Sequence, residues 1–92
     1  MNIYKDGQYL TENPTWHEED SPWKAKQIIK IMNQNDIKPQ SISEVGCGAG
    51  EILNVLYKQL DKNIRFNGFE ISPQAFELCK PKENERLRFH LS

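Results

Sequence analysis

The chain has 92 residues, with 12 Lys or Arg against 13 Asp or Glu and a formal net charge of −1. This balance disfavours binding to nucleic acid or to an anionic membrane, which normally needs a basic surplus or a basic stripe. No run approaches the ~20 consecutive apolar residues of a membrane span, and the N-terminus lacks the apolar region of a secretory signal, so we expect a cytoplasmic location. Cys47 and Cys79 form no CxxC pair, so we expect free thiols and no metal site.

Residues 1–20 show no sustained periodicity, and we expect an N-terminal arm that precedes a domain over residues 21–92. Ser21 and Pro22 predict the start of a helix, with Ser21 as the N-cap and Pro22 in the first turn. The helix continues to about residue 33, since apolar side chains follow at helical spacing. These apolar residues are Ala25, Ile28, Ile29 and Met32.

The next segments alternate between strand and helix patterns. A short strand over residues 42–45 runs into a turn over residues 46–50, where repeated glycines exclude a regular element. A second helix begins at Glu51, because apolar residues return with a 3.6-residue period.

The alternation continues to the end of the chain. A strand over residues 65–71 leads to Ser72 and Pro73, which predict another helix start, and Pro81 ends that helix. A last strand covers residues 86–91, in which we expect His90 to be an exposed or hydrogen-bonded strand residue rather than a metal ligand.

This order predicts an α/β fold: a Rossmann-like open parallel sheet with flanking helices. Only the first half of such a sheet, about three strands and three helices, is expected from this sequence. The strand over residues 42–45 then has an open edge, through which the chain could associate with another copy.

The glycine-rich turn is the first functional signal. Gly46, Gly48 and Gly50 let bare backbone approach a ligand and direct N–H groups of the next helix toward it, as in nucleotide sites. The dinucleotide fingerprint GxGxxG would need a glycine at position 51, but Glu51 stands there and would repel a pyrophosphate. An NAD site is therefore disfavoured, and Glu44 and Glu51 suit a ligand with a cationic head.

Glu70 is the second signal, at the carboxyl end of the next strand. A carboxylate in this place accepts hydrogen bonds from the two hydroxyls of a ribose in dinucleotide folds. The turn and Glu70 together predict a nucleoside site.

At these residues the sequence resembles a family. Residues 44–50 (EVGCGAG) resemble motif I of the class I S-adenosylmethionine-dependent methyltransferases, and residues 68–73 (GFEISP) resemble their second-strand motif. The resemblance implies S-adenosylmethionine as the cofactor and methyl transfer to an unidentified acceptor, with this chain supplying the cofactor-binding half.

The resemblance also implies a role for each matched residue. The three glycines of the turn would pack against the methionine part of the cofactor, Glu44 would hold its amino group, Glu70 would bind the ribose, and Ile71 would lie on the adenine. Cys47 belongs to the same stretch, where its small size matters more than its thiol. These cofactor-binding candidates are Glu44, Gly46, Cys47, Gly48, Gly50, Glu70 and Ile71.

The acceptor side is less defined. Trp16 and His17 are weak substrate-side candidates, because the arm before the first helix often folds over the cofactor in this family. The charge balance favours a small-molecule acceptor over a macromolecule, and the catalytic residues remain unknown. The alternative is a non-catalytic nucleotide-binding or assembly module derived from the same fold.

Overall fold

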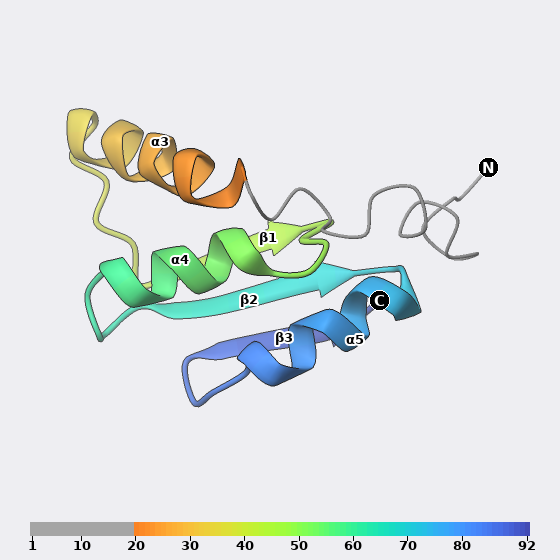
Figure 1. The fold of residues 1–92 in the computed structure, drawn as a ribbon. Helices are drawn as coiled ribbons and strands as arrows, with labels where there is room; N and C mark the ends of the chain where they lie inside the picture. Colours follow the sequence, from red (N-terminus) through yellow and green to blue (C-terminus); the bar gives the residue numbers. More distant parts are fainter. Residues whose placement is uncertain (1–19) are drawn as a thin grey trace.

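The computed structural model describes residues 20–92, which form a three-stranded parallel sheet of order β1-β2-β3 with its helices in one layer (Figure 1). This arrangement confirms the predicted Rossmann-like α/β sheet, with element bounds within one or two residues of those expected. In chain order, the elements are α3 (Ser21–Gln34), β1 (Ser41–Val45), α4 (Glu51–Gln59), β2 (Arg65–Glu70), α5 (Pro73–Cys79), the 3-10 turn η2 (Lys80–Lys82) and β3 (Leu87–Leu91).

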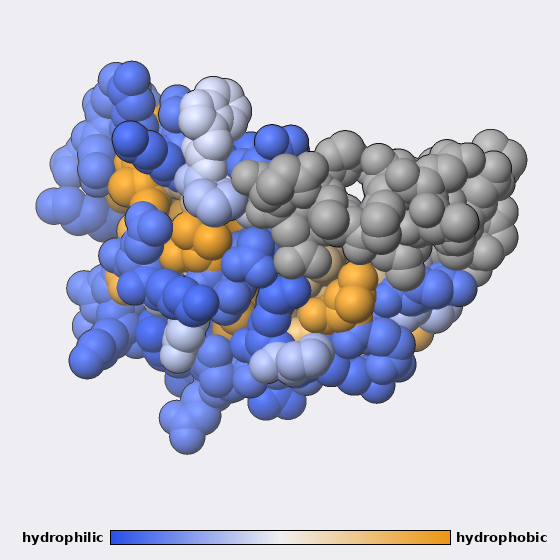
Figure 2. Space-filling view, in the orientation of Figure 1, coloured by the Kyte–Doolittle hydropathy of each residue, from blue (hydrophilic) through white to orange (hydrophobic). Residues whose placement is uncertain are grey.

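One face of the sheet carries the core. Phe66 of β2 pairs with Ile42 of β1 and with Leu87 of β3, and all three side chains point to the side covered by α4 and α5. Helix α3 packs mainly against α4 and adds Ala25 to the same core. A strip of hydrophobic surface shows between α3 and α4 in Figure 2, surrounded by hydrophilic residues. The fully buried large side chains include Phe66, Leu53, Leu56 and Leu87.

The other face of the sheet is more exposed and carries mostly polar side chains, together with Val45 and Phe69. Ser43, Arg88 and His90 are exposed there, and Asn67 is half-buried. The His90 ring lies 3.1 Å from Asn67 Oδ1 and stacks on Phe69, with 4.8 Å between ring centroids. His90 is therefore the exposed, hydrogen-bonded strand residue that the sequence predicts.

The two Ser-Pro helix starts differ. Ser72 caps α5 as predicted, because its hydroxyl accepts a hydrogen bond from Ala75 N at 3.3 Å. The prediction for Ser21 was wrong: Asp20 occupies the N-cap position of α3, with φ −90° and ψ −11°, and Ser21 is the first helical residue. The helical backbone conformation of Asp20 moves the helix start one residue toward the N-terminus.

Within residues 20–92, no helix is both long enough and apolar enough to cross a bilayer.

Candidate functional site

The glycine-rich turn follows the carboxyl end of β1 and is hydrogen-bonded to the end of β2. Gly46, Gly48 and Gly50 all have positive φ, at 72°, 60° and 82°, a conformation that side chains with a Cβ disfavour. The backbone N–H groups of Gly46 and Cys47 both donate to Phe69 O, at 2.7 and 3.2 Å. These hydrogen bonds fix the conformation of the loop. The positive φ angles explain why glycine stands at these three positions.

Glu70 points from the end of β2 into this turn. Its Oε1 accepts a hydrogen bond from Gly48 N at 2.7 Å, and its Oε2 accepts one from Ser72 N at 2.9 Å. The residue is only 2% exposed. Each carboxylate oxygen keeps a second lone pair for a ligand hydroxyl. The turn and the acidic residue thus meet at one place, as the nucleoside hypothesis requires.

Glu44 lies on the covered side of β1, and its buried Oε1 has no hydrogen-bond partner among residues 20–92. Burial raises the pKa of Glu44 from its usual 4.5 to about 7; Lys24 opposes this shift and Glu70 adds to it. A buried acceptor without a donor is costly, and a ligand ammonium group would supply the missing donor. The structure thus fits a cationic group at Glu44.

The glycines of the turn do not all face the same surroundings. A Cβ built on Gly46 meets no atom of residues 20–92 within 4 Å, so this part of the chain leaves open space beside the backbone there. A Cβ on Gly50 would lie 2.5 Å from Phe89 Cε1. The need for glycine at position 50 therefore includes close packing against Phe89, whereas Gly46 leaves room for a ligand.

The side chain of Cys47 is part of the hydrophobic core, and the residue is 8% exposed. A hydrogen bond with Cys79, together with burial, raises the pKa of the Cys47 thiol above its usual range. A thiol held in its neutral form is a poor nucleophile. Cys47 therefore contributes through its small size and its backbone rather than through its thiol.

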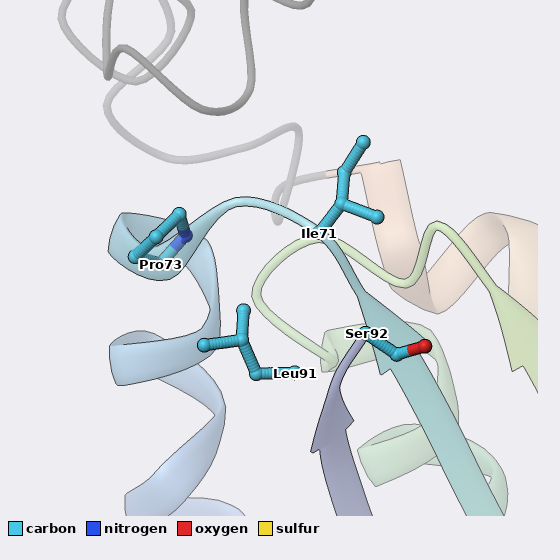
Figure 3. A pocket seen from close by; sticks show the side chains of 4 residues that line it. All are labelled: Ile71, Pro73, Leu91 and Ser92. Carbon is cyan, nitrogen blue, oxygen red and sulfur yellow. The ribbon is translucent and has the colours of Figure 1, made fainter.

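A shallow pocket of about 420 Å³ lies beside Glu70, where β2 and β3 end (Figure 3). It is lined by Ile71, Pro73, Leu91 and Ser92. Ile71 was expected at the site, but Leu91 and Ser92 were not. The register could have indicated them, because Glu70 pairs with Leu91 and Ser92 N donates to Glu70 O at 3.0 Å.

Two expected candidates, Trp16 and His17, lie outside the described residues. In the part of the chain from residue 20 onward, no three His, Cys, Asp or Glu side chains gather as a metal site.

Several solved structures that share this fold are described as methyltransferases. The plantazolicin methyltransferase BpumL, in complex with a triazolic desmethylPZN analog and SAH, matches 95% of this chain with a TM-score of 0.71 and 24% identity. A putative S-adenosyl-L-methionine-dependent methyltransferase from Methanococcus maripaludis matches 100% of the chain with a TM-score of 0.71 and 16% identity. No protein-family model matches the sequence, and neither does any curated protein.

These likenesses establish that the chain has the class I methyltransferase fold, as the resemblance of its motifs predicted. The chain spans 34% of the length of BpumL and 43% of the length of the Methanococcus protein.

Proposed function

We propose that this chain binds S-adenosylmethionine, and its demethylated product S-adenosylhomocysteine, at the carboxyl ends of β1 and β2. The observation that carries the proposal is the hydrogen bond between Glu70 and Gly48 N, which joins the acidic residue to the glycine turn. The presence of SAH in the BpumL complex supports the same ligand class. The chain would then supply the cofactor-binding part of a methyltransferase.

Each part of the ligand has matching chemistry in the chain. Glu70 would accept hydrogen bonds from the ribose hydroxyls, and the orphaned Oε1 of Glu44 would accept one from the ammonium group. The open space beside Gly46 would take the methionine part. The apolar side chains of Ile71 and Leu91 would flank the adenine in the pocket between them.

When bound, the cofactor supplies a methyl group on a sulfonium centre that an acceptor atom displaces in line. The chain itself would hold the adenosine and methionine parts of the ligand. It would thereby fix the direction of the methyl group and keep water from the buried carboxylates. Such positioning accounts for a large part of the barrier reduction in reactions that need little acid-base help. We propose a small molecule as the acceptor, in keeping with the balanced charge of the sequence.

Titration calorimetry of the 92-residue chain with S-adenosylhomocysteine tests the binding. We expect micromolar affinity, of order −8 kcal/mol. Glu70→Gln should abolish measurable heat, because the amide would place an N–H₂ group against a backbone N–H donor. The matched control is Glu77→Gln on α5, where the carboxylate is 67% exposed and should not matter.

A second variant guards against misfolding of the first. Ile71 is 39% exposed, so Ile71→Ala should weaken binding while leaving thermal stability unchanged. Absence of heat with the folded wild-type chain at high concentration would refute the proposal.

The alternative, a non-catalytic binding or assembly module, is favoured by β1, which within residues 20–92 pairs with β2 alone and leaves its second edge unpaired. Val45 is 87% exposed there, and an unpaired strand edge is a template for pairing with another chain. Transfer of a labelled methyl group distinguishes an enzyme from such a module. If the edge mediates self-association, Val45→Lys should convert the assembly to a monomer in sedimentation measurements.

A further inference from the structure

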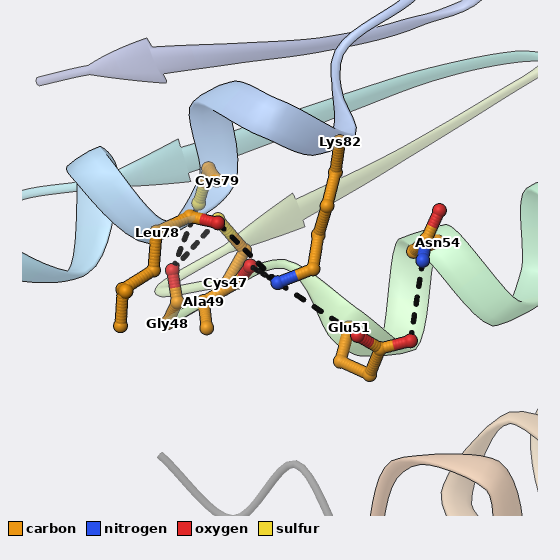
Figure 4. A network of polar contacts seen from close by, with 8 residues as sticks. All are labelled: Cys47, Gly48, Ala49, Glu51, Asn54, Leu78, Cys79 and Lys82. Carbon is orange, nitrogen blue, oxygen red and sulfur yellow. Dashed lines mark hydrogen bonds and ion pairs between the residues drawn. The ribbon is translucent and has the colours of Figure 1, made fainter. Parts of the chain in front are cut away.

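Lys82, in η2, reaches back to the glycine turn. Its Nζ donates hydrogen bonds to Ala49 O at 2.8 Å and to Leu78 O at 3.3 Å, and lies 3.7 Å from Glu51 Oε2 (Figure 4). One side chain therefore connects the end of α5, the turn and the first residue of α4. The sequence motifs that indicate the site do not include Lys82, because it lies 33 positions beyond Ala49.

The contacts of Lys82 are sheltered from water. The side chains of Lys82 and Glu51 are only 17% and 22% exposed. Glu51 is fixed in turn, because its Oε1 accepts a hydrogen bond from Asn54 at 3.2 Å. Charge-assisted hydrogen bonds in such a setting are stronger than those at an exposed surface. The ammonium group is thus both neutralised and held in place.

Neighbouring peptide groups of the turn are fixed in the same way. Cys79 Sγ donates to Gly48 O at 3.0 Å, while Gly48 N donates to Glu70 Oε1 at 2.7 Å. The segment from α5 to η2 thus holds the carbonyls of residues 48 and 49, and β2 holds the amide of residue 48. The turn is constrained from both sides while Gly46 stays open.

We propose that Lys82 is a positioning residue that holds the glycine turn in the conformation that receives the cofactor. This inference rests on the proposed function, but it assigns no direct ligand contact to Lys82. By fixing Ala49 O, the side chain removes a rearrangement that binding would otherwise have to produce, and less reorganisation means higher affinity.

The test is Lys82→Met, which removes the donor and its charge and keeps most of the side-chain volume. Affinity for S-adenosylhomocysteine, measured by calorimetry, should fall by about tenfold. The matched control is Lys80→Met: Lys80 is 51% exposed, pairs with Glu77 and lies 5.3 Å from the centroid of the Phe76 ring, so the loss there should stay below about twofold. Lys82→Arg keeps the charge and should recover most of the affinity.

Amide hydrogen exchange gives a readout that general destabilisation would not reproduce. In Lys82→Met, exchange should accelerate at Gly48 N and Gly50 N and stay unchanged in the middle of β2. Acceleration throughout the sheet would indicate a merely structural role and overturn the proposal, as would unaltered affinity. If Lys82→Met does not fold, the comparison of Lys82→Arg with wild type decides: equal exchange at the turn supports the proposal, and faster exchange throughout contradicts it.

The two proposals fail in different ways. If the wild-type chain binds no S-adenosylhomocysteine, the proposed function fails, and the exchange data alone then decide whether Lys82 holds the turn. If the wild type binds and Lys82→Met binds equally well, only the positioning role fails.

Discussion

Phe89 of β3 lies against Gly68, its register partner in β2, so closely that a Cβ on Gly68 would stand 2.7 Å from Phe89 Cδ1. The same ring would lie 2.5 Å from a Cβ on Gly50. A single aromatic side chain thus packs against both the central strand and the glycine turn, and it joins the core of the fold to the candidate site.

Gly68→Ala should destabilise the chain by about 1–3 kcal/mol, because the added methyl overlaps the Phe89 ring and Cys47 Sγ. Urea unfolding measures the loss. Replacing Phe89 with Leu in the same chain should recover part of it, since the smaller side chain frees the space above position 68. Full stability of Gly68→Ala alone would contradict the packing described.

Gly46→Ala should affect binding more than stability. The new methyl group meets no atom of the described part of the chain within 4 Å, so the expected cost to folding is the strain of φ 72°, about 1–2 kcal/mol. The methyl occupies the space proposed for the methionine part of the ligand, so affinity for S-adenosylhomocysteine should fall by more than about tenfold. Calorimetry and thermal unfolding of the same sample separate the effects, and undiminished binding would exclude the ligand from that space.

Stability should depend on pH through Glu44. Its pKa is about 7 in the folded chain and 4.5 without burial, so the folded state binds the extra proton between these values. Stability should therefore decrease as pH rises from about 4.5 to about 7, by on the order of 2 kcal/mol, and Glu44→Gln should remove this decrease. Lys24 and Glu70, the charged groups that act on Glu44, stay in place in that variant. Identical pH profiles of the two chains would disprove the shift.

Ligand binding should show the opposite pH trend. A cationic amino group interacts with the ionised form of Glu44, so affinity should increase between about pH 6 and about pH 8. Calorimetry in buffers of different ionisation enthalpy would detect the proton released on binding, and Glu44→Gln should release none.

Arg86 supports the loop at the opposite end of β2. Its Nη1 donates to Asp61 O at 3.2 Å and to Ile64 O at 2.9 Å, and its guanidinium lies 4.5 Å from the centroid of the Tyr57 ring. Arg86→Met should cost about 1–2 kcal/mol in chemical unfolding. Arg88→Met is the control, because Arg88 is 62% exposed and should change stability little. Equal losses in the two variants would refute a specific role for Arg86.

Local sequence signals predicted the elements well, but not every boundary. Ser21-Pro22 and Ser72-Pro73 carry the same signal, yet only Ser72 caps its helix. The difference lies in the residue before, since Asp20 already has helical backbone angles. A pattern of two residues does not contain that information.

Non-local contacts account for what the sequence did not reveal about the site. The sequence singled out Glu70 because an acidic residue at the carboxyl end of a strand is itself a signal, and the structure places its carboxylate within hydrogen-bond distance of Gly48 N. The contact of Gly50 with Phe89 depends on the packing of β3, and Lys82 reaches Ala49 from a separate helix-end segment. No spacing rule connects such pairs.

The parallel direction of the strands separates two ends of the molecule. All the residues proposed to hold the ligand lie at or near the carboxyl ends of the strands, while the loop over residues 35–40 lies at the other end (Figure 1). An affinity tag or a fluorescent reporter inserted into that loop would leave the binding end accessible. The chain could then be immobilised or labelled in a defined orientation for ligand screening.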